Sequence, residues 1–348
     1  MLARMKSLVP STLFLSSLGR FGKVGAVLIA VYLIIVIALG FYWSAEPDAF
    51  SVTENMAQKL NSTNTPVIGA ATATALIRAA ETMLDKPGGY LSNDITPPGL
   101  YLDNIPNWEF GVLVQVRDLT KAFRENFSRS QSQSTEDVDL IIADPNFNVP
   151  NDSWILPASE DQYRDAIAAM ESYLRRISNP SDQDGQFYAR ADNLSRWLTS
   201  VESRLGSLSQ RLSASVGQTQ ASNFVAPLSG DTAQADVAVA PATARIVKTP
   251  YLQIDDVFYE ARGTTWALMH FLQAVEIDFE AVLRDKNALV SVRQIIRELE
   301  ASQRTVFSPV ILNGGGFGLF ANHSLVMANY VSRANAAIID LRELLNQG

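Results

Sequence analysis

Histidines and carboxylates are the side chains that we consider first for acid–base chemistry, and cysteine is absent from the sequence. That absence excludes thiolate catalysis, disulfides and cysteine-ligated metals. His270 follows an apolar helical pattern and His323 precedes an expected helix start. Neither has the spacing of a zinc motif or of a nucleophile–base pair. We therefore predict a packed core histidine at 270, a cap or first-turn residue at 323, and no catalytic or metal-binding residue.

Carboxylates offer two further patterns. Glu276 and Glu280 lie one turn apart on one helical face, where a pair of acids could act as general acid and base. Residues 182–185 (DQDG) resemble part of a calcium loop, but Pro180 and Ala191 would stand at the first and twelfth ligand positions. The simpler interpretations are a solvated helix face and a turn.

A glycine-rich segment, residues 313–318 (NGGGFG), precedes the last helical pattern. Glycine-rich backbone at a helix start can cradle an anion, but the Lys-Ser/Thr pair of a phosphate-binding loop does not follow. The sequence therefore predicts no cofactor here, and favours a packing loop. A partner-docking or membrane-touching loop is the alternative, because Phe317, Leu319 and Phe320 are apolar.

Aromatic and acidic residues also gather in a Pro/Gly-rich stretch from Lys86 to Asn107, a combination suited to glycan or peptide contact. Ordinary loop packing is the alternative. Taken with the glycine-rich segment, this stretch gives the following predicted partner-docking residues: Tyr90, Tyr101, Asp103, Trp108, Phe317, Leu319 and Phe320.

The segment Val24–Trp43 contains no charged residue. At about 1.5 Å per residue its helix would match a hydrocarbon core of about 30 Å, so we expect it to contact inner-membrane lipid. Four bases precede it and the first acid is Glu46, which predicts a cytoplasmic N-terminus and a periplasmic bulk. A cleaved signal peptide, with a small-x-small site at 38–40, is the rival interpretation.

The remainder of the chain is acidic. It holds 24 Lys and Arg against 36 Asp and Glu once the four leading bases are set aside. This balance argues against nucleic acid and anionic lipid as partners of the soluble part.

Helical periodicity dominates the rest, so we predict a mostly α fold: one N-terminal transmembrane helix and a periplasmic helical bundle with long amphipathic helices. Apolar residues from Phe187 to Leu212 alternate spacings of four and three, which predicts either a bundle seam or an oligomer seam. The predicted units are a basic tail 1–23, the transmembrane helix 24–43, a stalk or short helix 44–65, a first lobe 66–216, a flexible linker 217–248 and a second lobe 249–348. Whether the lobes pack as one bundle is left open.

Several longer segments carry a family resemblance: LDKPGGYLSNDITPPG (84–99), DNIPNWEFGVLVQVRDL (103–119), FSRSQSQSTEDVDL (127–140), FYARADNL (187–194) and RLGSLSQRLSASVGQ (204–218). They resemble a family of uncharacterised proteobacterial membrane proteins, domain of unknown function 2333. The resemblance implies a Gram-negative inner-membrane protein facing the periplasm, and it implies no activity, cofactor or site residue.

The sequence thus favours a membrane-anchored scaffold or interaction protein of the cell envelope, with an envelope protein or a second copy of the chain as its partner. An envelope enzyme acting on cell-wall glycan through carboxylates is one alternative. A helical-bundle ligand sensor working through a membrane partner is the other.

Overall fold

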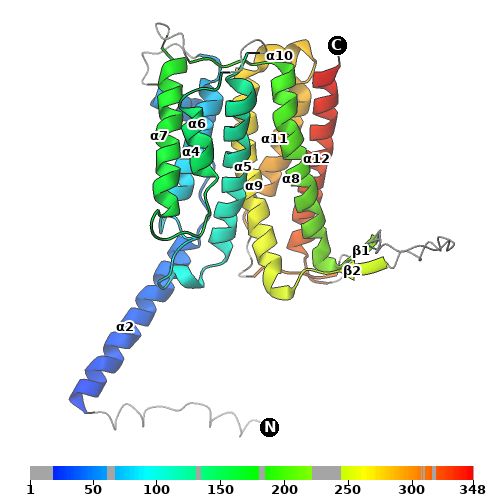
Figure 1. The fold of residues 1–348 in the computed structure, drawn as a ribbon. Helices are drawn as coiled ribbons and strands as arrows, with labels where there is room; N and C mark the ends of the chain where they lie inside the picture. The colour runs from blue at the N-terminus through cyan, green and yellow to red at the C-terminus, as the bar shows by residue number, and fades with distance from the viewer. Residues whose placement is uncertain are drawn as a thin grey trace, which may run out of the picture.

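The computed structural model describes residues 19–60, 67–130, 135–179, 185–221, 244–306, 308, 310–315 and 319–347. These residues form a mostly helical bundle from which one helix, α2 (Arg20–Trp43), projects (Figure 1). The mostly α fold with an N-terminal apolar helix is therefore confirmed.

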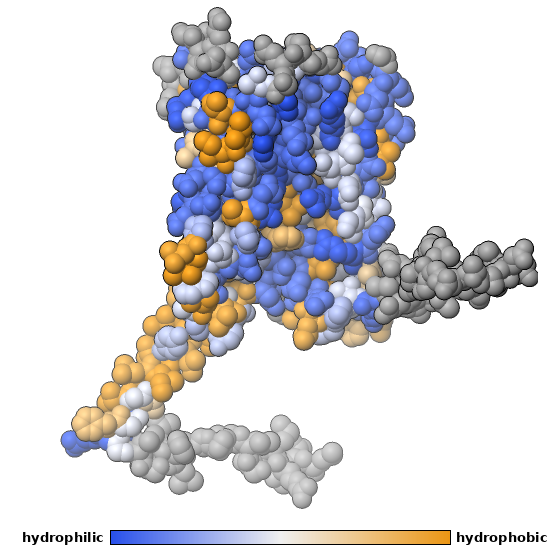
Figure 2. Space-filling view, viewed as in Figure 1, coloured by the Kyte–Doolittle hydropathy of each residue, from blue (hydrophilic) through white to orange (hydrophobic). Residues whose placement is uncertain are grey.

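Helix α2 is long and apolar enough to cross a membrane, although a signal sequence near an N-terminus would meet the same criterion. Its side chains point away from the bundle over most of its length, and Leu28 and Ile34 are about two-thirds exposed. Figure 2 shows the helix as a continuous apolar rod beneath a bundle whose wall is mostly hydrophilic.

The helices of the bundle follow in chain order. They are α3 (Val52–Lys59), α4 (Ala70–Asp85), α5 (Asn104–Ala122) with the π turn η3 (Phe123–Phe127), α6 (Leu140–Phe147), α7 (Ser159–Ile177), α8 (Ala191–Ser213), α9 (Ile254–Asp278), α10 (Glu280–Asp285), α11 (Leu289–Ser302) and α12 (His323–Asn346). Short 3-10 turns η2 (Gly99–Tyr101), η4 (Ala214–Val216) and η5 (Tyr251–Gln253) lie in the connections.

Helices α5 and α9 run parallel through the centre of the bundle and share one of its two largest helix–helix contacts. The Asn107 amide donates to Asp256 at their first turns (2.9 Å), and the rings of Phe127 and Phe279 lie 5.5 Å apart at their far ends. Gly111 brings the two backbones together, because a Cβ added there would lie 2.7 Å from the amide nitrogen of Thr264.

Helix α8 runs antiparallel to α12, the other extensive contact. The heptad pattern predicted for α8 is buried within the chain, at Leu194, Leu198, Val201, Leu205, Leu208 and Leu212. This seam therefore belongs to the bundle. Because α5 and α8 come from the first predicted lobe and α9 and α12 from the second, the two lobes share one hydrophobic core.

The predicted linker 217–248 begins and ends with two short strands, β1 (Gln218–Ala221) and β2 (Ala244–Val247). They pair antiparallel, with Gln218 opposite Val247. No strand is predicted here from the sequence, since four residues are too few for alternation to be visible. Residues 222–243 lie outside the described part of the chain.

The segment after the anchor does not stand away from the bundle as a stalk. Helix α3 lies against α4 with Val52 and Met56 buried, and the Asn55 amide donates to the Thr74 carbonyl (3.0 Å). The short-helix interpretation of this segment therefore describes residues 52–59.

Helix α9 ends at Asp278, and after Phe279 the short helix α10 begins at Glu280. The carboxylate of Asp278 is turned to the N-terminus of α4, where it accepts the amides of Gly69 (2.8 Å) and Thr72 (2.7 Å). A carboxylate satisfies otherwise unpaired amides at a helix start, and Gly69 has no side chain to do so. Asp278 and Thr72 are 206 positions apart in the sequence, so no local sequence pattern reveals this contact.

One end of the bundle receives α2, and we call it the proximal end. Helices α5, α7, α9 and α12 begin there, while α4 and α8 end there (Figure 1). Side-chain contacts agree with this arrangement: Arg211 near the end of α8 pairs with Glu260 near the start of α9, and Phe258 lies 6.4 Å from His323 at the start of α12.

We predict that Gly111→Ala and Gly263→Ala each lower the free energy of unfolding by about 1–3 kcal/mol, because an added methyl group overpacks the α5–α9 contact. A Cβ at 263 would lie 2.8 Å from the Trp108 carbonyl carbon. Urea unfolding followed by helical circular dichroism measures the loss. Gly206→Ala in α8 is the matched control, since its added Cβ would meet its nearest atom at 3.6 Å. Equal stability of all three variants would contradict the prediction.

Candidate functional site

The junction between α2 and the bundle is the place where buried charges lie close to the long apolar helix. The last turns of α2 rest on the loop of residues 86–102. Gly88 in this loop has a φ of +91°, and a Cβ there would lie 2.7 Å from Cγ of Trp43. A Cβ on Gly40 would lie 3.7 Å from Cβ of Pro98. The helix and the loop are thus in van der Waals contact.

A buried ion pair shapes that loop from inside. The side chains of Lys86 and Glu109 are both fully buried and form an ion pair. The Glu109 carboxylate also accepts the amides of Leu91 (2.8 Å) and Ser92 (2.9 Å) and the Ser92 hydroxyl (2.5 Å). Burial raises the pKa of Glu109, while Lys86 and these hydrogen bonds oppose the rise. Buried charges need this kind of complete pairing, so the loop conformation is closely specified.

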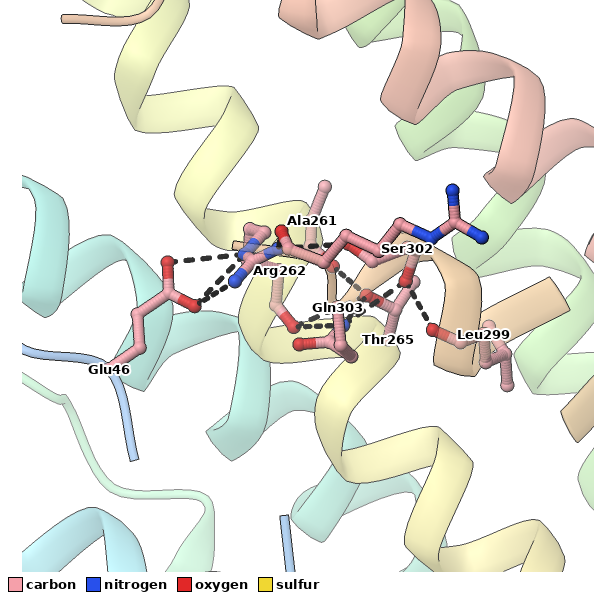
Figure 3. A network of polar contacts seen from close by, with 8 residues as sticks. Glu46, Ala261, Arg262, Thr265, Leu299, Ser302 and Gln303 are labelled. Atoms are coloured by element: carbon pink, nitrogen blue, oxygen red, sulfur yellow. Dashed lines mark hydrogen bonds and ion pairs between the residues drawn. The ribbon is translucent and has the colours of Figure 1, made fainter. Parts of the chain in front are cut away.

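A second charged contact ties the segment after α2 to the bundle (Figure 3). The guanidinium of Arg262 in α9 donates to the Glu46 carboxylate from Nε (2.9 Å) and Nη2 (2.5 Å). Its Nη1 donates to the carbonyl oxygens of Ser302 (2.9 Å) and Arg304 (2.8 Å). The Arg262 side chain is only 7% exposed, and its charge is held by groups from two separate parts of the chain, Glu46 and residues 302–304.

The end of α11 is fixed by the same network. The Gln303 amide donates to the Thr265 hydroxyl (2.7 Å), and the Ser302 hydroxyl donates to the Leu299 carbonyl (2.6 Å) (Figure 3). These bonds hold the carbonyls of residues 302 and 304 in the place where Arg262 requires acceptors.

Further along, Phe50 stacks on His270, with ring centroids 3.9 Å apart and ring planes 5° apart. The Phe50 amide donates to His270 Nε2 (3.0 Å), and Nδ1 lies 2.8 Å from the Trp266 carbonyl. Nε2 therefore accepts and Nδ1 carries the proton, which defines a neutral imidazole. Burial lowers the pKa of His270 to about 4. The histidine is a packed core residue, as predicted, and it positions residues 44–50 along α9.

His323 is the first residue of α12, and its Nδ1 accepts the Leu312 amide (3.1 Å). The cap itself is the preceding residue, Asn322, whose side chain accepts the Leu325 amide (2.9 Å). The predicted first-turn position of His323 is confirmed.

The carboxylate patterns have structural partners. Glu276 accepts from Arg293 (2.7 Å) and Glu280 from Arg284 (2.9 Å), so the two acids lie in separate surface ion pairs. Within the described residues no three His, Asp or Glu side chains are grouped to hold a metal ion. The acidic residues of the calcium-like segment, 182–184, lie outside the described part.

The predicted docking residues fall into two groups. Tyr90 and Trp108 are buried, so they support the surface from within. The four that lie at the surface are Tyr101, Asp103, Leu319 and Phe320, and all of them are at the proximal end. Phe317 lies outside the described residues.

Sequence reasoning missed the two buried ion pairs. Arg262 offered a signal, because it interrupts an otherwise apolar helical stripe, and a base in such a position needs a buried partner. Lys86 was interpreted only as part of a helix stop. The partners Glu46 and Glu109 carry no local pattern that marks them.

Together these features define an all-helical bundle that is closely joined to one apolar, membrane-length helix. The chain belongs to the family of domain of unknown function 2333, described as uncharacterized protein conserved in bacteria, which matches residues 18–348. No curated protein and no solved structure matches this chain.

We predict that Glu46→Ala destabilises the junction by about 3 kcal/mol, because it leaves the charge of Arg262 buried without a counter-charge. Limited proteolysis should then cut residues 44–50 faster than in the unaltered chain. Glu280→Ala is the control, since it removes an ion pair whose side chains are 53% and 64% exposed and should cost at most about 0.5 kcal/mol. Equal cleavage rates in the two variants would contradict this role of the Glu46–Arg262 ion pair.

We also predict a pH dependence that comes from His270. The unfolded chain binds a proton near pH 6.5, whereas the folded chain resists it until about pH 4. The stabilising contribution of neutral His270 is therefore complete above pH 6.5 and is lost as the pH falls towards 4, by up to about 1.4 kcal/mol per pH unit.

The comparison with His270→Gln isolates this contribution, because glutamine can still accept the Phe50 amide but does not titrate. Thermal unfolding between pH 4 and 7 should show a steeper loss for the unaltered chain than for the variant. Parallel pH profiles would show that His270 does not titrate in this way.

Proposed function

We propose that this protein is a membrane-anchored scaffold or interaction protein of the bacterial cell envelope. Its N-terminal tail lies in the cytoplasm, α2 spans the inner membrane, and the bundle stands in the periplasm. The bases before α2 and the acidic character after it support this orientation. The family of uncharacterized bacterial proteins is consistent with a bacterial envelope setting.

The observation that carries the proposal is the close join between α2 and the bundle. Residues 44–50 lie along α9, where they contact Arg262 and His270, and the last turns of α2 rest on the 86–102 loop. A bundle held this way is kept at a fixed height and orientation above the lipid. Such placement suits a protein that presents surfaces to neighbours in the envelope.

Helix α6 provides a surface of the right kind. It buries Leu140, Ala143 and Phe147, while Ile141 and Ile142 on its other side are 42% and 52% exposed and the preceding Val138 is 66% exposed. Figure 2 shows an orange patch in this region of an otherwise blue wall. A helix that is apolar on both sides normally has both sides covered, so we propose this patch as the partner-docking surface.

The enzyme and sensor alternatives are less well supported. The carboxylate pair 276/280 is divided between two surface ion pairs, and both Glu109 and Asp278 are saturated with hydrogen bonds. A sensor calls for a closed apolar pocket between helices. One cleft of the described part is open rather than closed, and its lining combines apolar side chains such as Phe258 and Met327 with the charged Arg262 and Arg304.

A photo-crosslinking amino acid at Ile142 tests the proposal in living cells. We expect one discrete adduct, formed with an envelope protein or with a second copy of the chain, because an apolar patch of this kind is stabilised by burial. The same amino acid at Val290, which is 72% exposed at the start of α11, is the matched control and should give no such adduct.

A clean monomer at both positions would contradict the scaffold proposal. A carboxyl-terminal reporter found in the cytosol, or a mature chain beginning near residue 41, would contradict the envelope placement. An adduct of twice the monomer mass would identify the partner as the chain itself.

A further inference from the structure

The proximal end of the bundle carries exposed apolar side chains on four separate connections. They are Tyr101 in η2 (74% exposed), Leu156 before α7 (90%), Tyr251 and Leu252 in η5 (76% and 81%), and Leu319 and Phe320 before α12 (102% and 73%). These segments are far apart in sequence, so the shared property belongs to one end of the bundle.

Contacts place the connection that contains Tyr101 beside α2. Gly40 lies within the apolar segment of α2, and a Cβ added to it would lie 3.7 Å from Cβ of Pro98 and 4.0 Å from Cδ2 of Leu102, on either side of Tyr101. A residue of the hydrocarbon-spanning segment thus contacts the loop that presents Tyr101. If α2 spans the bilayer, that loop lies at the boundary between acyl chains and headgroups.

Hydrogen bonds place two of the other connections at the same end of the bundle. Asn93 in the 86–102 loop donates to the Ser153 carbonyl (2.8 Å), which places the segment before α7 beside it. The Asn313 side chain donates to the Ser215 carbonyl (2.8 Å), which places the segment before α12 beside the end of α8. Figure 1 shows the connections at the lower end of the bundle, where η2 and the segment before α7 lie beside the upper part of α2.

We infer that the proximal end of the bundle is a second membrane contact, in which these apolar side chains enter the outer-facing lipid surface beside α2. Exposed aromatic and aliphatic side chains on one face are typical of interfacial membrane contact. The inference rests on the proposed anchoring by α2, and it assigns a lipid surface, rather than a protein, to Tyr101, Leu319 and Phe320.

Charge indicates the kind of lipid. Asp103, Asp255 and Asp256 lie near one another at this end and form an acidic cluster. The proximal end therefore has no excess of positive charge that would select anionic headgroups. Contact depends on apolar burial, so a phosphatidylcholine bilayer is sufficient and added salt does not release it.

Single cysteines make a direct test practical, because the chain has none of its own. The full chain is placed in phosphatidylcholine nanodiscs and labelled with nitrobenzoxadiazole at Leu252→Cys or Leu319→Cys. Some of the lipid carries a nitroxide on the acyl chain, which quenches the label on contact. Ile34→Cys within α2 and Val290→Cys at the far end of the bundle are the two reference positions.

We expect labels at 252 and 319 to be quenched to roughly half the extent seen at 34, as for side chains at the acyl boundary, and the label at 290 to be unaffected. Quenching at 34 with none at 252 and 319 would overturn the second contact and leave the anchor intact. No quenching at 34 would overturn the anchor, and the second contact with it. Quenching at 252 and 319 that is lost in 1 M salt would overturn the apolar mechanism.

Discussion

The structure depends on a buried charge. Arg262 lies within a helix whose neighbouring side chains pack into the core, and its guanidinium is stable there only while every donor has an acceptor. Glu46 supplies the carboxylate, and the residues at the C-terminal end of α11 supply two carbonyls. The need to pair this buried charge therefore positions three segments together. It holds the residues after α2 against α9, and it holds the end of α11 beside them.

The Lys86–Glu109 pair has a comparable effect on the other side of the junction. Its buried charges organise the loop that receives Trp43, and a glycine at 88 leaves room for the indole. The last turns of α2 are held by packing against the 86–102 loop, and the residues that follow α2 are held by the hydrogen bonds between Glu46 and Arg262. The parallel pair α5 and α9 connects both, because Glu109 lies on α5 and Arg262 on α9, and glycines allow these helices to approach closely.

Much of the fold could be predicted from sequence, because its cause is local. The α2 segment and the buried seam of α8 follow from uninterrupted hydrophobicity and from hydrophobic periodicity. The junction could not be predicted, because its partners are distant: 216 positions separate Glu46 from Arg262, and 220 separate Phe50 from His270. Aromatic residues near acids were interpreted as a surface, yet Tyr90 and Trp108 are buried, since composition alone does not tell which side of a loop faces the core.

The long separation between Glu46 and Arg262 has a consequence for biosynthesis. Ribosomes make the chain from its amino end, so the junctional carboxylate leaves the tunnel well before the guanidinium that it will neutralise. Until α9 and α11 have been made, residues 44–50 have neither the charge partner of Glu46 nor the face of α9 that covers them. The nascent chain therefore remains incompletely folded until then, and the docking of residues 44–50 onto α9 is a late step in folding.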